Sequence, residues 1–60
     1  MELIEIFRDI AIREGFTGGR SLKEISYETG LSVSEVIQRE VDLHLISADE
    51  ATAKLNQRLH

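Results

Sequence analysis

Residues 21–46, SLKEISYETGLSVSEVIQREVDLHLI, decide the fold, because they place two helix start signals on either side of one turn. Ser21 and Ser32 are each followed three residues later by a glutamate. This is the spacing of a capping box, in which both side chains satisfy free amides at a helix start. Gly30 provides a helix end of the kind that favours glycine, and the apolar Leu31 completes it. The stretch predicts helices over residues 21–29 and 33–45.

Two further helices flank this stretch. Ser47 precedes Glu50 by three residues, which predicts a helix over residues 48–59. Near the start of the chain, most apolar residues share one arc of a helix, and the polar residues lie opposite. The apolar arc holds Leu3, Ile4, Ile6, Phe7, Ile10 and Ala11, and the polar side holds Glu5, Arg8, Asp9 and Arg13. Ile12 falls alone on the polar side, and Gly15 supplies a stop, so this helix is expected over residues 2–14.

The four segments predict an all-α fold: a single domain, residues 1–60, built as a three- to four-helix bundle. No stretch alternates apolar and polar residues over the length of a strand, and proline is absent. A chain of this size buries only about 60% of its unfolded surface, so its own core is marginal. Without cysteine and with two histidines, the chain has neither disulfides nor a four-ligand zinc site. We therefore expect self-association, as a homodimer or other homo-oligomer, and no metal or cofactor.

Composition also excludes several classes of function. Charged residues interrupt every apolar run, so no membrane span is expected, and the acidic start is unlike a signal peptide. These features predict a cytoplasmic protein. No catalytic constellation is present, since Ser21, Ser32 and Ser47 are explained as helix caps and GFTGGR lacks the lysine and spacing of a phosphate-binding loop. We expect that the chain is not an enzyme.

The stretch from Ser21 to Ile46 resembles the helix-turn-helix of bacterial and phage transcription regulators, with no strand pair after it to make a full wing. In that family a short helix ends at a glycine followed by an apolar residue, and a second helix enters the major groove. Ser26 corresponds to the small residue where the two helices cross, and Val36 to the apolar residue between them. The matching residues are Ile25, Ser26, Gly30, Leu31, Val36 and Leu43.

The resemblance implies a small transcriptional regulator that reads double-stranded DNA with the helix over residues 33–45. Gln38 could pair with adenine and Arg39 with guanine or phosphate. The GGRS segment could anchor a phosphate at the start of the preceding helix, although it could equally be a solvated loop. The DNA-contacting residues implied in this way are Arg20, Ser21, Lys23, Ser32, Ser34, Gln38 and Arg39.

Two features favour an alternative, a protein-interaction module on the same scaffold, such as an antirepressor, a host-factor inhibitor or an oligomerisation domain. Residues 20–46 carry three basic and five acidic residues, a net charge of −2 on the unit meant to approach phosphate. In addition, Ile37, Val41 and Leu45 form a ridge four residues apart. The ridge lies partly on the side that the family turns toward DNA, and it predicts an interface.

Glu40 and His44 fall near the middle of the apolar arc of the same helix. A buried Glu40 would be costly without a partner, and His44, one turn further on, is its expected partner. The pair could also form a pH-sensitive contact, half of a metal site or the rim of an interface.

Overall fold

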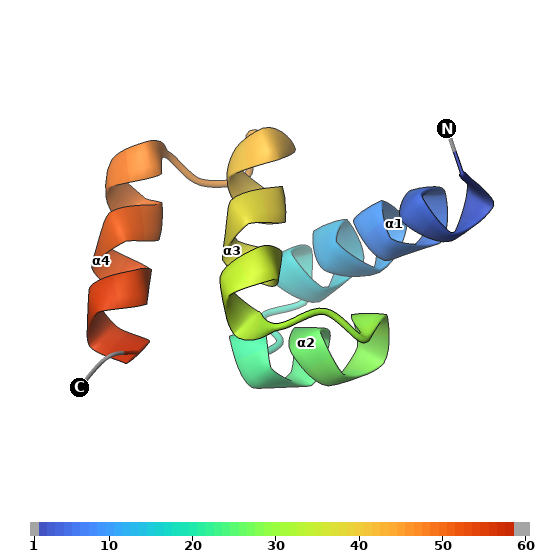
Figure 1. The fold of residues 1–60 in the computed structure, drawn as a ribbon, viewed down its shortest axis with the longest axis horizontal. Helices are drawn as coiled ribbons and strands as arrows, with labels where there is room; N and C mark the ends of the chain where they lie inside the picture. Colours follow the sequence, from blue (N-terminus) through green and yellow to red (C-terminus); the bar gives the residue numbers. More distant parts are fainter. Residues whose placement is uncertain (1, 59–60) are drawn as a thin grey trace.

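The computed structural model describes residues 2–58 as four helices and no strand. They are α1 (Leu3–Thr17), α2 (Leu22–Thr29), α3 (Val33–Asp42) and α4 (Ala48–Arg58). The all-α class, the division into four helices and the lack of a wing within these residues are confirmed. The molecule measures 33 × 20 × 20 Å, and α3 is its central helix, because it packs on each of the other three while α4 packs mainly on α3. Figure 1 shows α4 on the opposite side of α3 from α1.

The predicted helix starts are confirmed in detail. Ser21 Oγ accepts a hydrogen bond from the Glu24 amide at 3.1 Å, and Ser32 Oγ accepts one from the Glu35 amide at 3.1 Å. In both cases the glutamate side chain also reaches back to the serine amide, so each capping box is complete. A third serine, Ser47, caps α4 in the same way. The predicted last residue of α4, Leu59, lies outside the described residues.

Gly15 does not end α1, and that prediction is wrong. The helix continues to Thr17 and ends at Gly18 and Gly19, where Gly19 has a φ of 75° and the Arg20 amide donates to the Gly15 carbonyl at 2.9 Å. Gly15 is buried instead, and a Cβ atom placed on it would lie 2.7 Å from Cγ1 of Ile25. The glycine is therefore needed where α1 crosses closely over α2.

The end of α3 also differs from the prediction, because the helix stops at Asp42 and not near residue 45. His44 takes the left-handed conformation, with a φ of 60°, in the place where α1 and α2 use glycine. The Leu45 amide then donates to the Glu40 carbonyl at 2.9 Å, which closes the helix end. The apolar pattern continues through this turn because Leu43 and Leu45 still pack against the core.

The core consists of two apolar clusters on either side of α3. One contains Ile12, Ile25, Leu31 and Val36 and joins α1, α2 and α3. The other contains Ile37, Ile46 and Ala51 and joins α3 to α4. Val36 is fully buried, as the helix-turn-helix pattern requires, and Ser26 Oγ donates to the Leu31 carbonyl across the turn.

Candidate protein-interaction surface

The apolar arc of α1 points away from the rest of the molecule. Its large side chains are between 38% and 66% exposed, with Leu3 and Phe7 the most exposed of them. We call this surface the outer face, and it comprises Leu3, Ile4, Ile6, Phe7 and Ile10. Ile12, which the pattern placed alone on the polar side, is the α1 residue that enters the core and is fully buried. An amphipathic helix packs its apolar side inward as a rule, so α1 is reversed.

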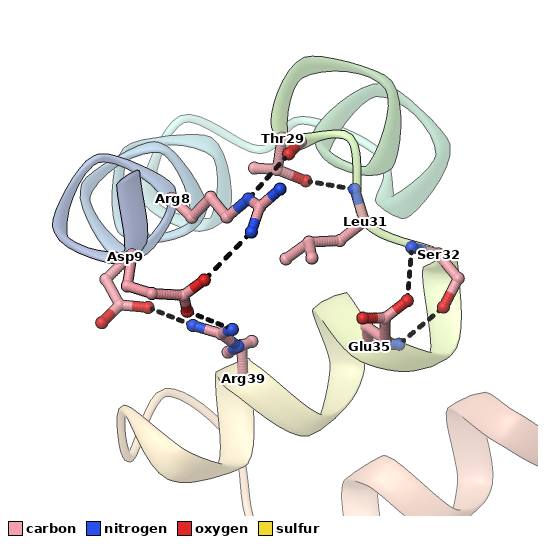
Figure 2. Close-up of polar contacts among 8 residues, drawn as sticks. Arg8, Asp9, Thr29, Leu31, Ser32, Glu35 and Arg39 are labelled. Atoms are coloured by element: carbon pink, nitrogen blue, oxygen red, sulfur yellow. Dashed lines mark hydrogen bonds and ion pairs between the residues drawn. The ribbon is translucent and has the colours of Figure 1, made fainter. Parts of the chain in front are cut away.

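The polar side of α1 faces inward because α3 presents an arginine to it. Arg39 Nη1 lies 3.2 Å from Asp9 Oδ1 (Figure 2). Arg39 also pairs with Glu5. Arg8 joins the same cluster, since its Nη1 atom contacts Glu5 Oε1 at 3.0 Å and its Nε atom donates to the Thr29 carbonyl at 3.2 Å. These groups are half-buried, so the ion pairs are only partly screened by water.

The charges in this cluster stabilise one another. Hydrogen bonds from Arg39 and then Arg8 lower the pKa of the Glu5 carboxyl below its ordinary value. In return, the hydrogen bond to Glu5 raises the pKa of the Arg39 guanidinium. Arg39 was predicted to contact DNA, but its guanidinium is committed to two carboxylates of α1.

The segment predicted to anchor a phosphate is also engaged within the chain. Arg20 pairs with Glu28, and Ser21 Oγ serves as the cap of α2. A hollow of about 480 Å³ lies beside Arg20, but its lining includes Glu14 and Glu28. Two carboxylates against one arginine give a wall that repels phosphate. Lys23 is exposed nearby.

The exposed surface of α3 is acidic. It carries Glu35, Gln38 and Asp42, and Gln38 Nε2 donates to Asp42 Oδ1 at 3.3 Å. The backbone hydrogen bond from Ser32 lowers the pKa of Glu35, which therefore stays ionised at neutral pH. Of the two serines near the start of α3 that were predicted to contact DNA, Ser32 caps the helix and Ser34 is half-buried.

The ridge predicted as an interface on α3 belongs to the core of the chain itself. Ile37 is 1% exposed and packs with Ile46 and Ala51, so it is wrong as an interface residue. Val41 is half-buried against the same cluster, and Leu45 is half-buried against the other one. The prediction missed this because α4, which covers the ridge, was not placed in space by its own sequence pattern.

Glu40 is buried, as its position predicted, but its partner is Lys54 of α4 and not His44. Its side chain is 1% exposed, and Lys54 Nζ lies 3.5 Å from Glu40 Oε1 without forming a hydrogen bond to it. Lys54 Nζ also lies 5.5 Å from the centre of the Phe16 ring, within the range of a cation–π contact. His44 is exposed, because its left-handed backbone turns it away from the helix.

Comparison with protein-family models, with curated proteins and with solved structures finds no match to this chain. Among residues 2–58, no helix combines the length and the apolar character needed to cross a bilayer. The arguments about function therefore rest on the surfaces described above. Of these, the outer face of α1 was not identified as a site from the sequence.

Proposed function

We propose that this chain is a protein-interaction module on a helix-turn-helix scaffold, and that it docks through the outer face of α1. The supporting observation is the exposure of that face. With about 200 Å² of surface for a large apolar side chain, the exposed fractions leave roughly 500 Å² of apolar surface on a single helix. Contiguous patches of about this size are often functional, because water contact with them is costly.

The covered side of α3 argues against reading DNA with this helix. Helix-turn-helix regulators expose the positions that correspond to Ile37 and Val41, whereas α4 packs over both of them here. The part of α3 that remains exposed is acidic, and Arg20 and Arg39 are already paired with carboxylates. Affinity for DNA depends on basic groups that replace counterions at phosphates, and this surface offers few.

A photo-crosslinking experiment tests the outer face directly. Benzoylphenylalanine is introduced at Phe7 in cells that produce the protein, with the same substitution at Tyr27 as the control. Tyr27 lies on α2 and is 91% exposed, so nonspecific capture would label it at least as strongly as Phe7. We expect adducts of discrete mass from position 7 and none from position 27. Equal labelling at both positions, or none at either, would contradict the proposal.

A DNA-binding measurement tests the competing function, a DNA-binding regulator. Fluorescence anisotropy with mixed-sequence and genomic duplexes at low salt should show no binding at micromolar protein. Sequence-dependent binding that Gln38→Ala abolishes would establish the regulator implied by the resemblance. It would overturn the interaction module, whatever the crosslinking result.

A further inference from the structure

We infer that the outer face of α1 is occupied by the same face of a second copy of this chain, with the two helices antiparallel and Glu2 of each copy beside Arg13 of the other. This inference rests on the proposed function and names the partner. It follows from the arrangement of residues around α1, from a helix start without a side-chain cap and from the size of the face.

The residues around α1 are self-complementary. At about 100° per residue, Leu3, Phe7 and Ile10 form a central line, with Ile4 and Ala11 along one edge and Arg13 along the other. Glu2, the N-cap residue directly before α1, lies at the start of the edge that holds Arg13. A two-fold axis between antiparallel helices brings like edges together. Placing Glu2 level with Arg13 of the second copy also places Ile4 level with Ala11. One alignment therefore pairs opposite charges on one edge and apolar groups on the other.

The start of α1 supplies an independent observation. Its N-cap residue, Glu2, makes no side-chain hydrogen bond to the first amides, whereas serine side chains cap α2, α3 and α4. Glu14 lies on the central line one turn beyond Ile10 and is exposed. In the alignment above, Glu14 of the second copy reaches the uncapped start of α1. A carboxylate there can accept from free amides and is favoured by the helix dipole.

The area and the charges favour a second copy over a lipid surface. Two outer faces together would bury roughly 1,000 Å² of apolar surface before any polar rim is counted, which is close to the lower limit for a specific interface. A helix that lies on a membrane carries lysine and arginine beside its apolar side. Around the outer face of α1, Glu2 and Glu14 accompany Arg13, and Arg8, which also borders this face, is paired with Glu5. Glu14 would have to enter the lipid.

A charge-exchange cycle tests the alignment. Sedimentation equilibrium measures dimerisation of the wild type, Glu2→Arg, Arg13→Glu and the double variant. Because the two-fold axis repeats the exposed ion pair, either single change should weaken the dimer about fivefold. The double variant should return to within about twofold of the wild type. Glu2 and Arg13 lie roughly 16 Å apart along one helix, so the rescue cannot arise within one chain.

A disulfide pair provides a second measurement. The chain has no cysteine of its own, so Ile4→Cys combined with Ala11→Cys introduces two thiols that are about 10 Å apart within one helix. That distance is too long for an internal disulfide. Under mild oxidation we expect a covalent dimer with two disulfides from this variant. The matched control, Tyr27→Cys, should give much slower crosslinking.

The outcomes separate the two proposals. A protein that stays monomeric at millimolar concentration, or a dimer in which the double charge variant is as weak as the singles, overturns the antiparallel pair. Adducts from Phe7 to other proteins would leave the interaction module standing in that case. Cosedimentation with phosphatidylcholine vesicles that Phe7→Asp abolishes would identify a lipid surface as the occupant and overturn both.

Discussion

The α2–α3 unit and α1 obey opposite rules within one small molecule. In the α2–α3 unit every start is capped, the turn glycine is left-handed, and the apolar side of each helix enters the core. In α1 the start lacks a side-chain cap, the apolar arc is exposed, and Glu5 and Asp9 face inward to Arg39. The difference shows that the first region is built to fold, whereas the second has a surface that folding alone does not require.

The largest expected effect on stability comes from comparing one residue on each side of α1. Ile12→Ala removes a fully buried side chain and should lower the free energy of unfolding by about 3 kcal/mol. Phe7→Ala, on the outer face, should change it by no more than about 0.5 kcal/mol. Urea denaturation of dilute protein, followed by circular dichroism, measures both. Equal losses would mean that the outer face is part of the fold.

Gly15→Ala tests the close contact between the two regions. Replacing glycine by alanine stabilises an ordinary helix. Here the new Cβ would meet Cγ1 of the buried Ile25 at 2.7 Å, so the two helices or the Ile25 side chain would have to shift. We expect a net loss of about 2 kcal/mol in unfolding free energy. In an Ile25→Ala background, which lacks the Cγ1 atom, Gly15→Ala should cost less than it does in the wild type. A gain in stability from Gly15→Ala would show that α1 and α2 lie further apart.

The end of α3 offers a smaller change of opposite sign. His44 holds a left-handed backbone that costs most residues energy, so His44→Gly should raise the unfolding free energy by about 0.5 kcal/mol. His44→Ala keeps the Cβ atom and should give no gain. Thermal melting of the three proteins under identical conditions distinguishes these cases. A loss with glycine would assign a stabilising contact to the imidazole.

The smallest expected effect concerns how the stability of the fold depends on pH. Because Arg39 and Arg8 lower the pKa of Glu5 in the folded chain, the carboxylate contributes stability above the ordinary glutamate pKa. That contribution should be lost as the pH falls below about 4. The stability difference between wild type and Glu5→Gln should therefore be constant from pH 7 to pH 5 and then shrink.

The sequence predicted the helices well, but it did not predict which side of α1 packs against the rest of the molecule. Serine–glutamate spacing and Gly30 located the ends of α2 and the starts of α3 and α4, because capping is a local interaction among neighbours in the chain. The facing of α1 could not be predicted in this way. It depends on the pairing of Arg39 with Glu5 and Asp9, which lie at least thirty residues earlier in the chain. Periodicity describes one helix at a time and cannot show such a match.

For the candidate site, too, the sequence predicted local interactions but not contacts between distant segments. Ser21 and Ser32 were recognised as caps, and that local role is what the structure gives them. The ridge on α3 was recognised as apolar, but whether α4 or another molecule covers it depends on packing between distant segments. The outer face of α1 was not predicted, because the apolar side of a helix is normally expected to pack in the core.

The buried Glu40 has a consequence for how α4 can be attached. Lys54 lies four residues before the end of that helix. Its Nζ atom can approach the Glu40 carboxylate only when α4 has one particular position along the axis of α3. If α4 slid by a single turn, about 5.4 Å, the carboxylate would remain in the interior with no counter-charge. The apolar contacts of Ala51 with α3 would by themselves tolerate such sliding, because they are not directional. The ion pair thus acts against misassembly, and exchange of α4 between copies would have to reproduce the same placement.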